Sequence, residues 1–218
     1  MIIVAGGKGK RMKADIPKQF ITVAGKPVLM HTIERFYAFS EKIGIIVVLP
    51  EPLIEYWQSL CKKYNFNIPH NLIKGGETRF HSVKNGLKLI DNNCLVAVHD
   101  GVRPLVSNNT LERVFSGAEK NGNAIPVMPV NDSLRKISHK NISKPVNRKK
   151  YFLVQTPQCF RCETLLKAYE QKYQKHFTDD ASVVEALGEE INTVEGNEEN
   201  IKLTRPFDLK IAGVLLGE

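Results

Sequence analysis

The sequence predicts an α/β fold with a mostly parallel sheet, on the basis of three observations. Short apolar runs alternate along the chain with segments of helical periodicity, as in successive strand–helix–strand units. Two of these runs open into glycine-rich turns, at Gly6-Gly7 and Gly75-Gly76. With 218 residues, 42% of them hydrophobic, the chain can bury a sizeable core, and no repeat or linker divides it. We therefore expect one domain spanning residues 1–218.

In the first half of the chain, strands are predicted where β-branched and aliphatic residues cluster and a turn residue follows. These runs are residues 2–5, 43–49, 71–74 and 95–98. Helices are predicted between them at residues 28–36 and 52–64 and after the second glycine turn, because apolar residues recur there at three- and four-residue spacing. Trp57 falls on the apolar face of the second helix, so we interpret it as a packing residue.

The second half continues the alternation, with one interruption. Helices are predicted at 107–119, 162–173 and 181–187, and strands at 124–127, 151–156 and 191–194. A further strand is predicted from Asn200, before a last helix that has Pro206 at its first turn. Between them, residues 131–152 alternate around a polar turn, which predicts a β-hairpin that projects from the sheet as an arm.

The first glycine turn has the composition of a phosphate-binding loop. Its glycines leave the backbone N–H groups open to an anion, and five basic residues follow closely. They are Lys8, Lys10, Arg11, Lys13 and Lys18. The spacing matches neither the P-loop nor the dinucleotide fingerprint, since Met12 stands where the latter needs glycine or alanine. We expect a triphosphate here; the alternative is a solvated basic turn.

Two later strand ends point to the same edge of the sheet. Gly76 and Ser82 belong to the second glycine turn, where they could contact a nucleotide base, although Thr78 and Ser82 also fit a helix cap. Asp100 follows the strand at 95–98, where a Mg²⁺ ligand would serve a bound triphosphate. Its alternative role is an ion pair with Arg103 that fixes the loop. His99 fits a structural, hydrogen-bonded histidine equally well.

Composition narrows the classes of partner. Lys plus Arg number 31 and Asp plus Glu 23, giving a net charge of +8 that favours an anionic ligand. Nucleic acid is disfavoured because the basic residues are scattered and form no recognised motif. We find no signal peptide and no long apolar span, so we expect a reduced, cytoplasmic protein without a membrane anchor. Cys159 and Cys162 have CxxC spacing, but nothing completes a zinc site, so we interpret them as core or loop thiols.

Seven motifs occur in order along essentially the whole chain. They are GGKGKRM with PKQF, GGETRFHSV, VHDGVRP, PVNDSLRK, NRKKYFLVQTPQCF, TDDAS and NIKLTRPFDL. Together they resemble the 2-C-methyl-D-erythritol 4-phosphate cytidylyltransferase family. The resemblance implies a three-layer, Rossmann-like nucleotidyltransferase fold with a protruding β-arm. It also implies Mg²⁺-dependent transfer of CMP from CTP to methylerythritol phosphate in non-mevalonate isoprenoid biosynthesis, by a homodimer whose arms complete each other's active sites.

The resemblance also implies roles for individual residues. The catalytic cations would be Arg11, Lys18, Arg148 and Lys202, with Arg148 acting across the dimer. Cytidine would contact Ala5, Gly6, Gly7, Gly76 and Ser82, with Asp100 near Mg²⁺ and the ribose. The substrate would contact Arg103, Asp132 and Ser133. An anionic phosphate nucleophile needs little general-base help, which agrees with the lack of a Ser/His/Asp or Cys/His set.

Two departures and two alternatives accompany this interpretation. Ser133 stands where the family often has Thr, and Asn147 stands where an acidic residue often precedes the arginine. The nearest alternative is a ribitol-5-phosphate cytidylyltransferase, which resembles this chain in its CTP site; the compact segment before Lys18 and the Thr204-Arg205-Pro206 run favour methylerythritol phosphate. The other alternative is a non-catalytic nucleotide-binding or nucleic-acid-binding protein.

Overall fold

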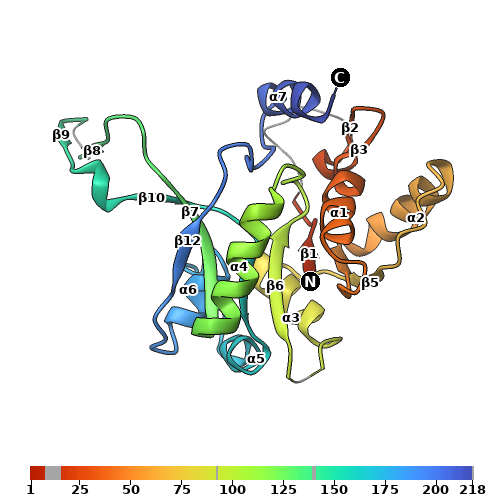
Figure 1. The fold of residues 1–218 in the computed structure, drawn as a ribbon, viewed down its shortest axis with the longest axis horizontal. Helices are drawn as coiled ribbons and strands as arrows, with labels where there is room; N and C mark the ends of the chain where they lie inside the picture. The colour runs from red at the N-terminus through yellow and green to blue at the C-terminus, as the bar shows by residue number, and fades with distance from the viewer. Residues whose placement is uncertain (8–15, 92, 139–140, 218) are drawn as a thin grey trace.

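The central sheet is parallel in its first half. A computed structural model describes residues 1–7, 16–91, 93–138 and 141–217 of the chain (Figure 1). Strand β1 (Ile2–Val4) lies between β4 (Ile46–Leu49) and β6 (Leu95–Asp100), parallel to both, and β5 (Asn71–Lys74) continues the sheet beside β4. These four strands confirm the predicted parallel sheet, and their carboxyl ends share one edge.

The second half of the sheet mixes directions. Strand β11 (Gln158–Arg161) runs antiparallel to β6 and to β7 (Asn123–Pro129). Strand β7 also pairs with β10 (Phe152–Val154) in the antiparallel sense and with β12 (Thr193–Glu195) in the parallel sense. The single strand predicted at 151–156 is therefore wrong in extent, because the chain leaves the sheet after Val154 and re-enters it at Gln158.

Helices cover both faces of the sheet, as the three-layer prediction requires. On one face lie α1 (Val28–Phe39), α2 (Ile54–Lys63) and α4 (Asn108–Asn121); on the other lie α3 (Arg79–Leu87), α5 (Cys162–Glu170) and α6 (Asp180–Glu185).

Strand β1 contributes side chains to the hydrophobic clusters on both faces of the sheet. Ile3 packs into the cluster with α1 and α4 while Ile2 packs into the cluster with α3 and α5, because successive strand residues face opposite ways. Trp57 is fully buried in the first of these clusters, which confirms the packing interpretation.

Short elements close the carboxyl edge. A 3₁₀ turn, η2 (Lys18–Phe20), leads to the small hairpin of β2 (Thr22–Val23) and β3 (Lys26–Pro27), and a second 3₁₀ turn, η3 (Glu51–Leu53), precedes α2. The last helix, α7, spans Pro206–Leu216 and begins at Pro206 as predicted.

The strand expected from Asn200 is wrong, since residues 201–204 pair with no strand. This segment runs beside the loop after β6 instead. The Leu203 N–H donates to the Val102 carbonyl at 2.9 Å, and the Leu203 side chain is fully buried. Its apolar residues are therefore used to pack under α7 rather than to extend the sheet.

The predicted arm is present as a hairpin that extends away from the body (Figure 1). Strands β8 (Arg135–Ile137) and β9 (Ser143–Pro145) pair antiparallel, and the 3₁₀ turn η4 (Arg148–Lys150) leads back to β10. Large apolar side chains along the arm are about half exposed or more; they are Ile137, Ile142, Tyr151, Phe152 and Leu153. Such a surface is typical of a protein interface.

No helix in the described ranges is both long and apolar enough to cross a lipid bilayer.

Candidate active site

A cavity of about 440 Å³ lies at the carboxyl ends of β1, β4, β5 and β6. Residues that directly follow these strands, or end them, line it, including Ala5, Pro50, Gly75 and Asp100. In open α/β sheets this edge is where ligands bind. The cavity also receives side chains from η2, the start of α3 and the segment before α7, which are far apart in the sequence.

The first wall of the cavity is the backbone that leaves β1. Gly7 packs directly against the lysine at the start of η2: a Cβ atom at Gly7 would lie 3.3 Å from Lys18 Cε. The Lys18 ammonium donates to the Leu203 carbonyl at 3.1 Å. Beside it, buried Gln19 donates from Nε2 to the Ala5 carbonyl at 2.7 Å. The PKQF segment therefore holds the backbone after β1 in place and brings one ammonium group to the cavity.

The second wall is the turn between β5 and α3. The Ser82 hydroxyl accepts from the Gly76 N–H at 3.1 Å and donates to the Thr78 carbonyl at 2.9 Å. Thr78 caps the helix by accepting from the His81 N–H, which confirms its predicted cap role. Gly76 is required for steric reasons, because a Cβ atom there would lie 2.4 Å from His81 Cβ. This turn presents backbone atoms, rather than a side chain at Gly76, to a ligand.

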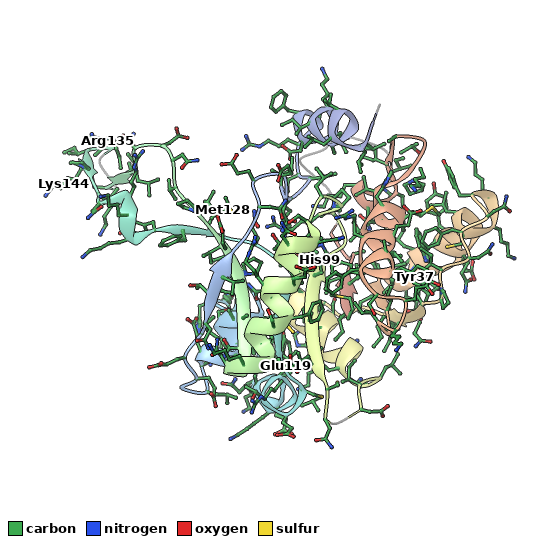
Figure 2. The ribbon with its side chains drawn as sticks, in the orientation of Figure 1. Tyr37, His99, Glu119, Met128, Arg135 and Lys144 are labelled. Atoms are coloured by element: carbon green, nitrogen blue, oxygen red, sulfur yellow. The ribbon has the colours of Figure 1, made fainter. Side chains whose placement is uncertain are left out.

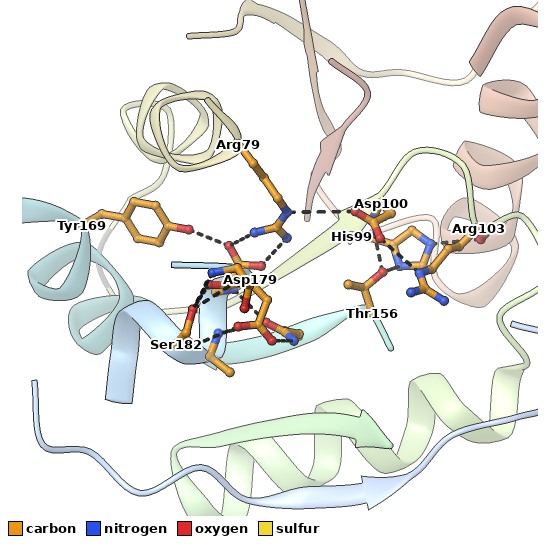
Figure 3. Close-up of polar contacts among 12 residues, drawn as sticks. Arg79, His99, Asp100, Arg103, Thr156, Tyr169, Asp179 and Ser182 are labelled. Atoms are coloured by element: carbon orange, nitrogen blue, oxygen red, sulfur yellow. Dashed lines mark hydrogen bonds and ion pairs between the residues drawn. The ribbon is translucent and has the colours of Figure 1, made fainter. Parts of the chain in front are cut away.

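Asp100 is the centre of a cluster of cations (Figure 3). Its Oδ2 atom is 3.0 Å from Lys202 Nζ and 3.1 Å from Arg103 Nε, and its Oδ1 atom is 4.0 Å from Arg79 Nε. Burial alone would raise the pKa of this carboxyl, but attraction by Lys202, Arg79 and Arg103 holds the pKa well below its usual range. Asp100 is therefore ionised at every physiological pH.

Arg79 connects the cavity with the helical layer of α5 and α6 through its contact with Asp180. Its guanidinium forms a bidentate pair with Asp180, with Nη1 to Oδ1 at 2.9 Å and Nη2 to Oδ2 at 2.5 Å. Tyr169 donates to the same Oδ1 at 2.6 Å (Figure 3). Asp180 is fully buried, whereas the Arg79 side chain is 26% exposed and lines the cavity. The pair thus positions a guanidinium at the cavity through contacts made in the core.

His99 and Thr156 support the Asp100 backbone (Figure 3). The Thr156 hydroxyl accepts from the Asp100 N–H at 3.1 Å and lies 3.0 Å from His99 Nδ1, while His99 Nε2 lies 3.0 Å from the Arg103 carbonyl. Burial is the largest effect on His99 and lowers its pKa to about 4, so the ring is neutral. The structural interpretation of His99 therefore holds.

The structure brings together many of the residues singled out from the sequence. Those that line the cavity are Ala5, Gly6, Gly7, Lys18, Gly76, Ser82, Asp100 and Lys202. Arg103 touches Asp100 and also donates from Nη1 to the Asn200 carbonyl at 2.7 Å, so the loop-fixing ion pair considered as the alternative for Asp100 is present. Arg11 lies outside the described residues.

Three other candidates, like Arg103, are not among the residues that line the cavity. Asp132, Ser133 and Arg148 belong to the exposed arm, and Arg148 donates to the Asn131 carbonyl within it. Figure 2 shows how far the arm reaches, since the arm residues Arg135 and Lys144 lie well away from His99 in the body. Within one chain, the described part of the arm therefore does not complete the cavity.

Arg79 and Gln19 are among the lining residues that were not predicted as site residues. Each belongs to a motif quoted for the resemblance, GGETRFHSV or PKQF. A charged side chain in the first turn of the helix after a glycine turn was the available signal for Arg79. Burial of Gln19 had no sequence signal.

The described residues hold no group of three or more His, Cys, Asp or Glu side chains that could bind a metal on their own. Asp100 and Glu77 are the two acidic residues among those that line the cavity. Mg²⁺ commonly takes one or two carboxylates together with substrate phosphates and water, so this donor set fits a metal that arrives with a nucleotide.

Comparison with known proteins gives one consistent result. A family model described as 2-C-methyl-D-erythritol 4-phosphate cytidylyltransferase (IspD) matches residues 1–218. The enzyme of that name from Phocaeicola vulgatus is 55% identical over 216 residues, covering 99% of this chain and 98% of the relative. The crystal structure of the enzyme of that name from Thermus thermophilus is similar with a TM-score of 0.80 at 31% identity, over 99% and 97% of the two chains. The 4-diphosphocytidyl-2C-methyl-D-erythritol synthase structure from Anaerococcus prevotii has a TM-score of 0.83 at 28% identity, over 100% and 95%.

Proposed function

Because the chain belongs to the 2-C-methyl-D-erythritol 4-phosphate cytidylyltransferase family, we propose that its cavity at the carboxyl ends of the parallel strands is where it transfers CMP from CTP to methylerythritol phosphate. The products are 4-diphosphocytidyl-2-C-methyl-D-erythritol and pyrophosphate, in isoprenoid biosynthesis. The observation that carries the location is the cluster of Lys18, Lys202 and Arg79 beside two glycine-lined walls. A nucleoside triphosphate fits this cavity, because the glycine-lined walls allow close backbone contact with its base and the cations can pair with its phosphates.

The glycine walls are the proposed cytidine site. Gly76 and Ser82 form one side, and Ala5, Gly6 and Gly7 form the other. Backbone N–H and C=O groups on both sides can pair with the edge of a cytosine ring. The Ala5 carbonyl supports this role, because the Gln19 side chain donates to it and so fixes its orientation.

The proposed mechanism is electrostatic. The attacking group is a phosphate that is already anionic, so the protein must bring two anions together and stabilise the charge that grows on the α-phosphate and the leaving pyrophosphate. Lys18 and Lys202 line the cavity with their ammonium groups, and Arg11 is proposed to add a third cation. Lys202 is also proposed to hold the methylerythritol phosphate, and its pairing with Asp100 fixes the starting position of the ammonium.

We propose that Asp100 holds Mg²⁺ together with oxygens of the nucleotide. Its Oδ2 atom is occupied by Arg103 and Lys202, while Oδ1 faces only the more distant Arg79 among the described residues, so Oδ1 is the better ligand atom. A bound Mg²⁺ neutralises phosphate charge and polarises the α-phosphate. Arg103 then acts mainly to position Asp100, and its direct contact with substrate stays a prediction.

The arm is proposed to complete the site of a second copy in a homodimer. Asp132, Ser133 and Arg148 lie outside the cavity of their own chain, yet they are the residues proposed to contact the methylerythritol phosphate. The exposed apolar side chains along the arm, such as Phe152 and Leu153, supply a surface for subunit contact. A cytoplasmic location also stays a proposal, supported by four cysteines that form no disulfide.

The test of function is pyrophosphate release by the purified protein with CTP and Mg²⁺. Methylerythritol phosphate and ribitol 5-phosphate are offered in parallel, and release is expected with the first at a rate at least about a hundredfold higher, because a site that pairs with one polyol leaves buried groups unpaired with the other. Preference for ribitol 5-phosphate would overturn the substrate while keeping the chemistry. No release with either would overturn the proposed site and its chemistry together.

The test of the arm is complementation between two impaired variants. Lys18→Met removes a cation of the cavity, and Arg148→Ala removes the arm cation, so neither homodimer turns over well at limiting methylerythritol phosphate. If the arm acts on the partner, a mixed dimer has one intact site, and co-expression in equal amounts restores about a quarter of the wild-type activity.

An arm that serves its own chain would give no restoration, since both sites of the mixed dimer would be impaired. The same samples, measured by light scattering after size-exclusion chromatography, report the mass. A monomeric mass for the wild type would reject the dimer outright.

A further inference from the structure

The amino end of β6 and the start of α5 bring two cysteines together at the end of the sheet opposite the cavity. In the antiparallel pairing of β11 with β6, Arg161 lies opposite Leu95, so the next pair outward is Cys162 opposite Cys94. The Cys162 N–H donates to the Cys94 carbonyl at 2.9 Å, which shows that the pairing continues to these residues. Directly opposed residues in antiparallel strands point to the same side of the sheet.

The two thiols also share one acceptor. Cys94 Sγ and Cys162 Sγ each lie 3.3 Å from the Asp91 carbonyl oxygen. Both sulfurs therefore sit around a single oxygen atom, on the same side of the strand pair. The Cα separation of a hydrogen-bonded antiparallel pair, about 5.5 Å, falls in the middle of the range that disulfides span.

The two thiols differ in solvent exposure, and this difference sets the order in which they react with an oxidant. Cys94 is exposed, whereas Cys162 is buried at 1% exposure. Burial, with a further contribution from Cys94, raises the pKa of the Cys162 thiol to about 11. An oxidant from solution thus reaches Cys94 first, and Cys162 is placed to react with the product.

We propose that Cys94 and Cys162 form a reversible disulfide when the protein meets hydrogen peroxide, and that this disulfide joins β6 to α5. The Cys94 sulfur attacks a peroxide oxygen, the O–O bond breaks, and a sulfenic acid and water result. The Cys162 sulfur then attacks the sulfenic sulfur and releases a second water. Two thiols are oxidised, one hydrogen peroxide is reduced to two waters, and thiol reductants reverse the bond.

The other cysteines are poorly placed to compete. Cys159 packs into the cluster on the opposite face of the sheet from Cys162, and Cys61 lies on α2, which belongs to that same opposite layer. The CxxC pair is therefore divided between two layers, and Cys162 pairs across strands rather than along the chain.

The disulfide is expected to stabilise the fold and to leave turnover unchanged, because Asp100 is at the other end of β6. Closing a long loop restricts the unfolded chain, and we expect the oxidised wild type to unfold roughly 5 to 10 °C higher than the reduced protein. Thermal unfolding is measured by circular dichroism before and after a stoichiometric peroxide pulse, and again after dithiothreitol.

The chemical readout is a peptide map. Trypsin releases Cys94 in the peptide from Leu89 to Arg113, because Pro104 blocks cleavage after Arg103, and Cys162 in the peptide from its own position to Lys167, so the disulfide appears as one cross-linked species. Cys94→Ser, at an exposed site, is expected to lose both the cross-link and the rise in unfolding temperature. Cys61→Ser is the matched control and keeps both.

Three outcomes would overturn the proposal. They are retention of all four thiols after the pulse, conversion of Cys94 to sulfinic acid without a cross-link, and a cross-link that joins a different pair of cysteines.

Discussion

Replacing Lys18 with methionine is expected to lower kcat for pyrophosphate release about a thousandfold while leaving the fold intact. The ammonium lies on the cavity wall beside Gly7, where the phosphates of CTP are proposed to bind. Methionine keeps the unbranched stem that packs on Gly7 and removes the charge, together with its bond to the Leu203 carbonyl. The measurement is steady-state kinetics at saturating CTP, with unfolding temperature followed in parallel.

Lys62→Met is the matched control for this variant. Lys62 is exposed in the last turn of α2, away from the residues that line the cavity, and the same substitution there is expected to leave kcat within about twofold. Unchanged turnover in Lys18→Met would remove Lys18 from the mechanism. A variant that fails to fold would show instead that the side chain is needed to build the wall.

The second large effect is expected on stability, from Asp180→Asn. This change removes the counter-charge of Arg79 and leaves a partly buried guanidinium with Asp100 as its nearest carboxylate, 4.0 Å away. Removing one member of a buried ion pair usually costs 3–5 kcal/mol, and because Arg79 keeps 26% exposure we expect about 3 kcal/mol. Urea denaturation of the purified variant gives the value.

Asp179→Asn provides the comparison, since it makes the same chemical change one residue earlier. Asp179 caps α6 by accepting from the Ser182 N–H at 3.0 Å, and asparagine is an equally good cap. Asparagine has one acceptor oxygen and loses the bond that Asp179 Oδ2 accepts from Gln158 Nε2 at 2.8 Å, so a loss of about 1 kcal/mol is expected, well below that of Asp180→Asn. If the two variants lost equal stability, the effect would belong to the helix start rather than to the buried pair.

The fold could be predicted where local pattern and final environment agree. Residues 71–74 and the start of α1 at Val28 were placed correctly because each run carries its own turn or proline signal. The break between β10 and β11 was missed because only Gln155, Thr156 and Pro157 separate the two strands, and β11 begins with Gln158 and ends with Arg161, so it has no apolar run of its own. The segment from Asn200 looks like a strand, but tertiary packing of Leu203 under α7 decides its conformation.

The site was predictable to the extent that its residues follow strands. Ala5, Gly76 and Asp100 each lie at or just after a carboxyl end, so the parallel topology alone brings them together. The pair of Arg79 and Asp180 could not be found this way, since 101 positions separate the two residues and neither spacing nor composition links them. The same holds for the two thiols at the opposite end of β6, which meet only through strand register.

The wall at Gly76 has a consequence for inhibitor design. A side chain at this position would collide with His81, with 2.4 Å to its Cβ and 3.0 Å to its carbonyl carbon. A compound that binds the main chain of this turn therefore contacts atoms that no single substitution at Gly76 can remove without displacing the first turn of α3. A resistance substitution at that contact would also distort the cavity, so this wall, as the proposed cytidine site, is a durable target for compounds that imitate a pyrimidine.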